Sequence, residues 1–353
     1  MKNTIKIFAV FAVLVTLSVS VYAGNDQRRG TAGAPELLIN PWARNTGWGG
    51  VNVAGVRGVS SMFSNVAGLA FVDNVEVAYT ATMLYGGKNG LSSGASINAF
   101  GLGVRLHERG VAGVYVMSMS FGEIDVTKYL SPESGNGTFS PSYMNINVAY
   151  SHSFTNTIHG GVTFKMVSES IDNVSGSGLG IDAGIQYVTG EDDELKFGIS
   201  LKNWGPTMKY GGSGLSLQMI NTAGNNFTVE TRASEMQLPT CLNIGLSYDI
   251  LIPSHDQRVT LAAAFTSNAF LRDNYTIGVE YSLMKMFQVR CGYIMQPGLW
   301  TVNRATANNG LCAGASVDVP LSKDDNIGLT IDYSYQSASP LKGTHAIGAS
   351  FRF

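Results

Sequence analysis

The chain has 353 residues, a formal net charge of −2 and only 14% charged side chains, so it offers no basic face of the kind that holds nucleic acid. Hydrophobic residues make up 44% of the chain, which also contains 42 glycines, 15 tyrosines and 16 phenylalanines. This composition is unusual for a secreted soluble domain. It is typical of a chain in which half of each strand faces lipid and the other half faces a polar or plugged lumen.

Residues 1–23 have the organisation of a secretory signal peptide. Lys2 and Lys6 come first, the apolar run IFAVFAVLVTLSVS follows, and small residues surround the junction before Gly24. The alternative, a membrane anchor helix, needs about 20 apolar residues, and this run is shorter. No cysteine follows the junction, which argues against a lipid anchor. We therefore expect an exported chain. If the mature chain lies in a membrane, it must be a β-barrel, because no later apolar run is long enough for a membrane helix.

Residues 24–73 are rich in glycine, mix apolar with polar residues and do not alternate. Such a segment is expected to lie inside a wide lumen as a plug or hatch. The alternative is a periplasmic tail, which the apolar content of the segment disfavours.

From residue 74 to residue 353 the chain alternates between apolar and polar residues in segments of about 9–11 residues or somewhat more, the length that a tilted membrane strand needs. In LKFGISLK, for example, Leu195 and Phe197 point one way while Lys196 and Lys202 point the other. We predict an all-β, 14-stranded antiparallel transmembrane barrel. The expected strands lie near 74–85, 92–106, 111–121, 142–154, 158–171, 178–189, 194–203, 241–252, 257–270, 274–283, 285–296, 308–319, 325–336 and 344–353.

The connections between these strands provide an independent test of the barrel. Every second connection is short and mostly polar: ERG, TNT, EDDE, PSHD, a link around Met284, and LSKDD. The opposite set includes the long segments 122–141, 204–240 and 296–307. Periplasmic turns are short and extracellular loops long in outer-membrane barrels, whereas a soluble sandwich has no reason to separate its loops in this way.

The final strand places Ile347, Ala349, Phe351 and Phe353 on one face. We expect it to close the barrel against the first strand. Its end, with Phe351 and Phe353, is similar to the C-terminal signal that the barrel-assembly machinery reads in outer-membrane proteins.

No residue pattern indicates catalysis, a metal or a cofactor. The five histidines lie in different segments without metal-ligand spacing, and Ser153 with His159 flanks a short turn instead of a long-loop rim. GWGG (residues 47–50) lacks the strand, helix and Lys-Ser/Thr of a phosphate loop, so we interpret it as a turn. The acidic run at 191–194 is interpreted as a solvated turn in preference to a calcium site. Cys241, Cys291 and Cys312 are expected to be unpaired, although a bridge between the last two is possible across one hairpin.

The 204–240 connection is unusual because it is long and apolar. It contains Trp204, Met208, Tyr210, Leu215, Leu217, Met219, Ile220, Phe227 and Val229. Long loops without structure of their own are usually functional or disordered, and apolar content disfavours disorder. Either this connection folds over the barrel mouth, or it presents an apolar patch to a partner.

Residues 31–70 resemble the N-terminal signature of the PorV/PorQ family of Bacteroidetes outer-membrane proteins. The matching positions lie in LLINPWARNTGWGGVNVA and SSMFSNVAGLA, while Trp42, Trp48 and Val66 depart from the pattern. The positions that match the signature are Ile39, Pro41, Ala43, Arg44, Gly47, Gly49, Asn65, Ala67, Gly68 and Leu69. The second half of this signature is shared with FadL-like fatty-acid channels.

The resemblance implies a non-enzymatic role in type IX secretion. A PorV-like barrel docks beside a giant translocon barrel, receives the C-terminal signal domain of a secreted cargo and passes it to a surface attachment complex, to which PorQ-like members belong. Extracellular loops would do the binding, which would explain the apolar 204–240 connection. The alternative function is a FadL-like transporter of hydrophobic small molecules, with the glycine-rich segment as its hatch. A purely structural barrel is a third hypothesis.

Overall fold

The computed structural model describes most of the chain after the predicted signal peptide, and residues 1–23 lie outside the described part. The described residues are 24–86, 94–127, 137–252, 256–301, 304, 306–322 and 327–353.

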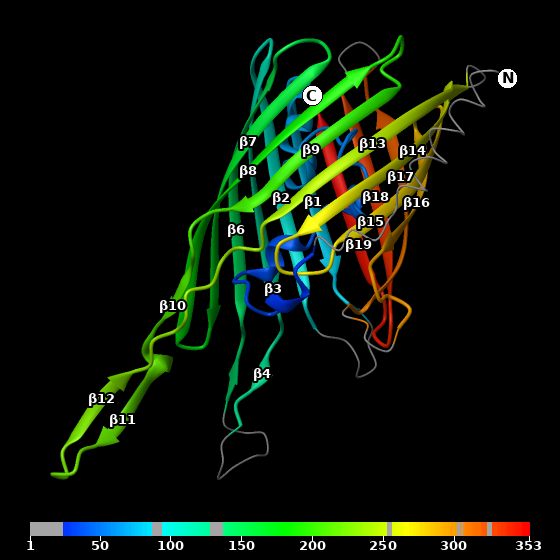
Figure 1. Cartoon of the computed structure of the whole chain (residues 1–353). Helices are drawn as coiled ribbons and strands as arrows, with labels where there is room; N and C mark the ends of the chain where they lie inside the picture. The colour runs from blue at the N-terminus through cyan, green and yellow to red at the C-terminus, as the bar shows by residue number, and fades with distance from the viewer. Residues whose placement is uncertain are drawn as a thin grey trace.

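Fourteen long antiparallel strands, all within the described residues, form one closed barrel (Figure 1). They are β1 (Val75–Met83), β2 (Ser96–His107), β3 (Gly110–Ser120), β6 (Ser142–Ser153), β7 (Ile158–Ile171), β8 (Val174–Thr189), β9 (Leu195–Trp204), β13 (Cys241–Ile252), β14 (Gln257–Asn268), β15 (Asn274–Leu283), β16 (Phe287–Met295), β17 (Asn308–Pro320), β18 (Gly328–Ala338) and β19 (Thr344–Arg352). Successive strands pair with each other and β19 pairs with β1, where Val75 and Phe353 exchange two backbone hydrogen bonds. The predicted fold class is confirmed.

The remaining elements are short. Two hairpins, β4 (Ile124–Asp125) with β5 (Thr138–Phe139) and β11 (Ser216–Ile220) with β12 (Asn226–Glu230), lie in the long connections, and β10 (Lys209–Gly211) extends β8. The helical turns are η1 (Asp26–Arg28), η2 (Pro35–Leu38), α2 (Ala43–Thr46), α3 (Ser61–Ser64), η3 (Val66–Phe71) and η4 (Ser213–Leu215). A helix of sufficient length and apolarity to cross a membrane is not found in the described part of the chain.

Most strand boundaries fall within a few residues of those predicted, but β8 begins earlier than expected. The predicted strands end at residue 171 and begin again at residue 178, with DNVSGS between them. In the structure Ile171 pairs with Val174 across a two-residue turn in which Asp172 has a φ of 48°. A tight turn needs only two residues, so the remaining small residues continue the strand along β7. The link around Met284 is also a tight turn, with positive φ at Met284 and Lys285.

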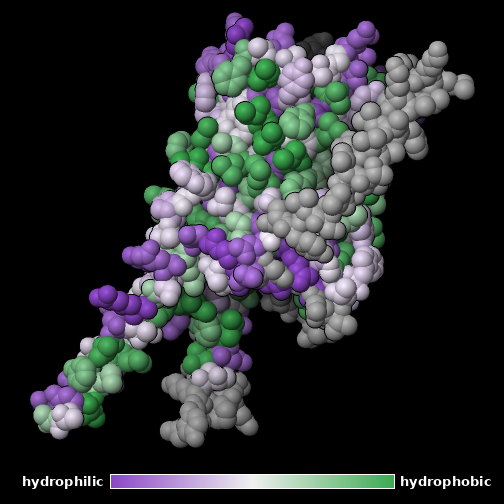
Figure 2. Space-filling model, in the orientation of Figure 1, coloured by the Kyte–Doolittle hydropathy of each residue, from purple (hydrophilic) through white to green (hydrophobic). Residues whose placement is uncertain are grey.

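Side chains alternate between the two faces of the wall as the sequence pattern requires. In β9, Leu195, Phe197 and Ile199 are exposed on the outside, whereas Lys196 and Ser200 are buried inside. Figure 2 shows apolar side chains over the part of the barrel wall in view. This outer apolar surface matches what lipid requires, because the hydrocarbon region solvates apolar groups and leaves every backbone group to be paired within the barrel.

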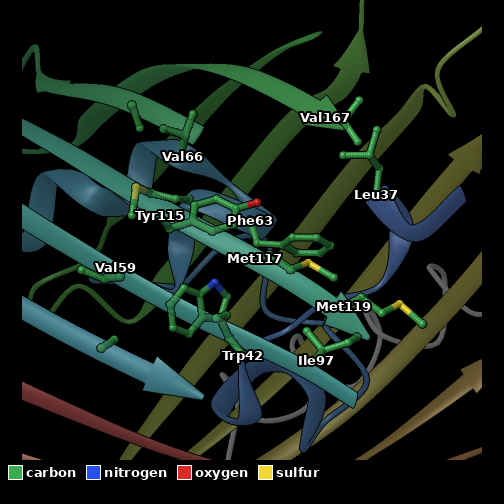
Figure 3. Close-up of a cluster of buried hydrophobic side chains, with 14 of the residues drawn as sticks. Leu37, Trp42, Val59, Phe63, Val66, Ile97, Tyr115, Met117, Met119 and Val167 are labelled. Carbon is green, nitrogen blue, oxygen red and sulfur yellow. The ribbon is translucent and has the colours of Figure 1, made fainter. Parts of the chain in front are cut away.

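Residues 33–72, which we call the internal segment, lie inside the barrel. Trp42, Met62, Phe63 and Leu69 form a buried cluster with inward-facing residues of β2, β3, β6 and β7 (Figure 3). The wall members of the cluster include Ile97, Tyr115, Met117, Tyr143 and Val167. Burying a side chain of this size contributes about 1.5–3 kcal/mol, so one side of the lumen holds this segment by apolar packing.

On the opposite side, the same segment crosses the lumen against a row of small residues. We call residues 47–54 the strap and its contact positions on the wall the glycine girdle. The girdle consists of Gly198, Gly245, Ala262, Gly278, Gly292 and Gly314, on β9 and β13–β17. A Cβ atom on Gly292 would lie 2.3 Å from the carbonyl oxygen of Trp48, and one on Gly198 would lie 2.6 Å from that of Val53. The strap therefore touches the wall only because these positions carry no side chain larger than a methyl group.

The cysteines are free, as expected. The possible Cys291–Cys312 bridge does not form, because Cys312 is opposite Gly292 and Cys291 is opposite Ala313. This one-residue offset places Cys312 inside the lumen and Cys291 on the outer face.

The girdle generates a stability prediction. Gly292→Ala introduces a Cβ into the backbone of Trp48, so the strap must shift, at a cost of about 1–3 kcal/mol for an overpacked site. We expect faster tryptic cleavage after Arg44 and Arg57 and a lower temperature for the heat-induced gel shift of the folded barrel. Gly211→Ala is the matched control, because a Cβ there meets nothing within 4 Å. Wild-type protection in Gly292→Ala would show that the strap does not depend on the girdle.

Candidate functional site in the barrel lumen

The strap divides part of the lumen into two cavities. The larger, of about 770 Å³, is lined by strand residues near the short turns, such as Ser247 and Asp249 of β13. The smaller, of about 320 Å³, is lined by residues nearer the long connections, such as Cys241 and Asn243 of the same strand. Gly245, which contacts the strap, lies between these two pairs. Each cavity also includes residues from the connections at its own end of the barrel, so the strap lies across the path that joins them.

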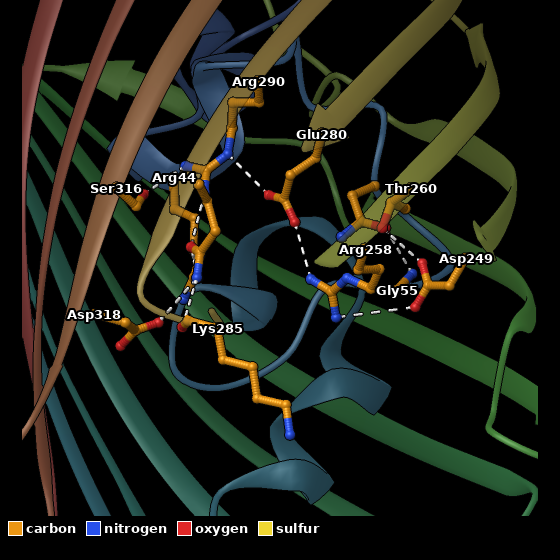
Figure 4. A network of polar contacts seen from close by, with 12 residues as sticks. Arg44, Gly55, Asp249, Arg258, Thr260, Glu280, Lys285, Arg290, Ser316 and Asp318 are labelled. Carbon is orange, nitrogen blue, oxygen red and sulfur yellow. Dashed lines mark hydrogen bonds and ion pairs between the residues drawn. The ribbon is translucent and has the colours of Figure 1, made fainter. Parts of the chain in front are cut away.

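The larger cavity is ionic (Figure 4). Arg290 Nε lies 3.0 Å from Glu280 Oε2, and Arg258 Nη2 lies 3.1 Å from Glu280 Oε1. Arg290 also lies 3.7 Å from Asp332 and donates a 2.7 Å hydrogen bond to Ser316. The Arg290 side chain has no exposed surface, so it is held in the wall by fixed partners.

The internal segment joins this network through one side chain. Arg44 of α2 donates a 2.6 Å hydrogen bond to Gln288 Oε1 and lies 3.5 Å from Asp318. Asp318 also pairs with Arg352 of β19 at 2.7 Å. Arg44, which lies just before the strap in the chain, is therefore held by polar contacts with β16 and β17 and, through Asp318, with β19.

Two further buried pairs line the lumen on the β7–β9 side. Lys165 lies 2.6 Å from Asp182 and donates a 2.7 Å hydrogen bond to Asn203. Lys196 pairs with Asp249, which also accepts a hydrogen bond from Thr260. These partners explain how lysines remain at inward positions, because a buried charge needs a hydrogen-bonded counter-charge.

The smaller cavity is amphipathic. Phe63, Leu84, Ile294 and Leu299 alternate around it with amide and hydroxyl side chains, including Asn243, Thr266, Asn268 and Gln296. Among the described residues that line this cavity, the one lysine is Lys202, whose ammonium group lies 3.4 Å from the centre of the Phe63 ring. Such a lining suits a small molecule with both apolar and polar groups.

The residues of the family-like signature all belong to the internal segment. Gly47 packs on Gly314, and Gly49 adopts a φ of 72° in the GWGG turn. Ile39 packs against the apolar cluster, and Pro41 and Ala43 are buried. Together with Arg44, these side chains place the strap across the lumen.

The second half of the signature positions the end of the internal segment. Asn65 caps η3 by accepting a hydrogen bond from Ala67 N, and its amide nitrogen donates to the carbonyl oxygens of Val53 and Ile185. Gly68 closely contacts the carbonyl group of Val56, and Leu69 is fully buried. Asn65 thus connects strap, helical turn and wall.

The apolar 204–240 connection does not fold over the mouth. Figure 1 shows β11 and β12 projecting away from the barrel wall. Leu217 pairs with Val229 and Met219 with Phe227, so these four share one face of the hairpin, and all are exposed. Ile220 is 70% exposed at the hairpin end, and Leu215 is half-buried in η4.

Three of the residues predicted to bind a partner do not belong to this exposed hairpin. Met208 is 1% exposed because it packs against Gly33 of the internal segment, and Tyr210 is half-buried in β10. Trp204 ends β9 on the outer wall, paired with Ile181. An apolar composition does not reveal which apolar side chains the rest of the chain covers, and the partner-binding role of this set stays a prediction.

Ser153 and His159 are brought together, with Ser153 Oγ 2.9 Å from His159 Nδ1. They lie at the short-turn end, where the His159 ring also contacts the Phe71 ring in a tilted arrangement. In the described part of the chain no group of three or more metal-ligating side chains occurs. Phe351 and Phe353 contact each other edge to face at 4.7 Å, and their role as an assembly signal stays a prediction.

Sequence reasoning missed the lumen ion pairs. Their signal was present, because Asp182, Asp249, Glu280, Arg290 and Asp332 occupy the polar positions of alternating strands. Alternation places each on the inner face, and most of the pairs join neighbouring strands, so the register of each strand pair was the missing information.

Comparison with solved structures finds outer-membrane transport channels. The Pseudomonas putida toluene transporter TodX matches with a TM-score of 0.57 at 13% identity, covering 89% of this chain and 99% of that one. A Pseudomonas aeruginosa FadL homologue matches at 0.54 and 12%, covering 90% and 99%. The Ralstonia pickettii toluene transporter TbuX matches at 0.55 and 13%, covering 89% and 98%. No family model and no curated protein matches.

The fold is therefore that of a FadL-like outer-membrane barrel, and the protein belongs in the bacterial outer membrane. None of these comparisons supports the PorV/PorQ resemblance. At such low identity they establish the fold, and the function must be argued from the lumen and the surface.

The ionic network generates a second stability prediction. Glu280→Gln removes the closest counter-charge of a fully buried Arg290, and breaking such a pair costs about 3–5 kcal/mol. We expect unfolding of the lipid-reconstituted barrel at lower denaturant concentration, followed by tryptophan fluorescence. Glu235→Gln, which breaks an exposed pair with Lys209, should leave the midpoint unchanged. Equal midpoints for wild type and Glu280→Gln would contradict a structural role for the network.

Proposed function

We propose that the protein is a FadL-like outer-membrane channel for small amphiphilic molecules, with the strap as its gate. The observation that carries this proposal is that a single backbone segment lies between two cavities that lead to opposite ends of the barrel. The likeness to TodX and TbuX, described as toluene transporters, and to a FadL homologue supports transport as the class of function.

The lining of the cavities narrows the substrate class. The cavity toward the long connections holds aromatic and aliphatic groups among amides, and the cavity beyond the strap is charged. A pure hydrocarbon would gain nothing from the charged second cavity. A small molecule with an apolar body and a polar group fits both.

The strap is suited to opening because its attachment differs from that of the rest of the internal segment. The apolar cluster anchors residues 34–72 on the β2–β7 side. The strap meets the opposite wall at the small girdle residues, and its buried Trp48 and Val51 form a separate small cluster with Ala262. It can therefore shift without dismantling the apolar anchor.

A disulfide lock tests the gate. A Cβ on Gly348 would lie 3.4 Å from Ala43 Cβ, close to the separation of about 3.8 Å in a disulfide. Ala43→Cys with Gly348→Cys, in a Cys291→Ser background, would fix α2, which leads directly into the strap. We expect oxidation to lower the uptake of labelled benzyl alcohol by about tenfold and reduction to restore it, an effect of about 1.4 kcal/mol.

The single-cysteine variants are the controls, since they carry the same surface changes without a cross-link. Deletion of residues 24–54 provides a second measurement, because it removes the strap while retaining the strands, and it should raise the single-channel conductance of folded protein in planar bilayers. Uptake that is independent of oxidation, together with unchanged conductance, would exclude the strap as a gate.

A second function is favoured by the β11–β12 hairpin. We propose that this hairpin docks a protein partner, and the PorV/PorQ resemblance implies a giant translocon barrel or a cargo C-terminal signal domain. Leu217, Met219, Phe227 and Val229 form an exposed apolar face, while Gln218, Thr228 and Glu230 lie on the other face. An isolated two-stranded hairpin with one apolar face is the kind of surface that a partner covers.

Substitutions on the two faces test docking separately. Met219→Ser with Phe227→Ser should abolish recovery of a large outer-membrane barrel, or of cargo proteins that share a C-terminal domain, with the tagged protein from native membranes. Gln218→Ala with Thr228→Ala, on the polar face, is the matched control. Both variants should show the normal heat-induced gel shift of an assembled barrel. If the two double variants recover the same partner proteins, or if neither recovers any, a docking role for the apolar face is contradicted.

A further inference from the structure

A third cavity, of about 330 Å³, lies apart from the two that the strap separates. It opens between the long-connection ends of β3, β6, β7 and β8, beside η2 and β10. Most of its described lining is apolar, and it shares no residue with the two lumen cavities described above. The apolar members are Pro35, Phe121, Pro141, Ile171 and Val174, together with the rings of Tyr143 and Tyr210.

Two carboxyl groups lie in this apolar lining. Glu36 of η2 and Glu169 of β7 are within hydrogen-bonding reach of each other, and the Tyr210 hydroxyl donates to Glu169. Within the described part of the chain, neither carboxyl group forms an ion pair, and Glu36 Oε2 has no hydrogen-bond partner. Negative charge at an apolar site without a counter-ion is unfavourable unless a ligand supplies the cation.

Tyr143 is an independent indication of a ligand. Its side chain lines the cavity from β6 and is 1% exposed, yet its hydroxyl has no hydrogen-bond partner in the structure. Buried hydroxyl groups are normally paired, and a lone one at a cavity wall indicates a group that binds there. The hydroxyl oxygen can accept a hydrogen bond.

We propose that this cavity binds an organic ammonium ion with a small apolar body. An ammonium group has three N–H donors, and the site offers three acceptors: the Glu36 and Glu169 carboxylates and the Tyr143 hydroxyl oxygen. Phe121 and the tyrosine rings supply faces that attract a cation, and Pro141, Ile171 and Val174 contact the apolar body. This inference goes beyond the proposed channel, and it holds whether or not the strap opens.

The site should also depend on pH. Burial, followed by the neighbouring Glu169, raises the pKa of Glu36 to about 7. The other titratable groups that line the cavity are Glu169, Tyr143 and Tyr210, and no described lysine, arginine or histidine lines it. Below this raised pKa Glu36 is protonated, and above it Glu36 is a carboxylate. Ammonium binding should therefore strengthen as the pH rises through about 7.

The test uses the full-length barrel purified in detergent, with phenethylamine as the probe and titration calorimetry as the measurement. We expect saturable binding that is several-fold tighter at about pH 8 than at about pH 5.5. Glu36→Gln and Glu169→Gln should each weaken it about tenfold or more, as expected for loss of a charge-assisted hydrogen bond. Tyr143→Phe should weaken it less. Glu191→Gln, at a short turn at the other end of the barrel, is the matched control.

Two ligands distinguish the alternatives. Phenethyl alcohol has the same apolar body without the charge, so equal binding of the alcohol would overturn the ammonium assignment. Calcium chloride at the same concentration tests whether the carboxyl pair is instead a metal site, and calcium binding that excludes the amine would also overturn it. Heat-induced gel shifts verify that every variant is a folded barrel, so weakened binding cannot be attributed to loss of the fold.

Discussion

The architecture of the lumen depends on the absence of side chains at one level of the wall. Along β9 and β13–β17, the inward position at this level is glycine or alanine, and the backbone of residues 47–54 occupies the space that side chains would fill. Gly198 is directly paired with Gly245 and Gly278 with Gly292, so the small positions are adjacent across strands as well as along the strap. A larger residue at Gly292 or Gly198 would clash with the strap backbone.

The lumen is chemically asymmetric around this strap. On the β2–β6 side, Ile97, Tyr115 and Met117 bury the internal segment by apolar contact. On the β13–β18 side, charged side chains are held by one another, and Arg44 is the internal residue that joins them. The apolar side supplies attachment and the polar side leaves space, because charged groups keep their hydrogen-bonding partners and do not collapse onto the strap. Because the apolar side of the lumen is filled and the polar side is not, the two cavities lie beside the strap and do not surround the whole internal segment.

The sequence was sufficient for the wall and insufficient for what lies inside it. Period-two alternation located every long strand because lipid and lumen impose opposite polarity on neighbouring residues, as in LKFGISLK. The turn at Asp172–Asn173 was placed too wide because its composition resembles a longer loop. Arg290 and Glu280 form a cross-strand pair within one hairpin, which its register already dictates. The contact of Gly292 with Trp48 could not be predicted in this way, because it joins segments remote in the chain. The alternation of β11 was visible as Leu217 and Met219, but whether its apolar face is covered depends on the direction in which the hairpin projects.

The hairpin and the internal segment are physically connected at the base of the 204–240 connection. Met208 and Met236 exchange backbone hydrogen bonds, and the same stretch continues to Gln237, whose carbonyl oxygen accepts a 2.9 Å hydrogen bond from Gly33 N. Arg28 also donates to the Gln237 side chain. The hairpin that would bind a partner through the apolar face of β11–β12 is therefore connected by backbone hydrogen bonds to the internal segment. The point of contact lies a short distance along the chain before α2 and the strap. Docking and gating therefore do not exclude each other. If the bound and free hairpins hold Gly33 differently, the contacts at Gln237 allow a protein bound at the surface to bias the position of the gate in the lumen.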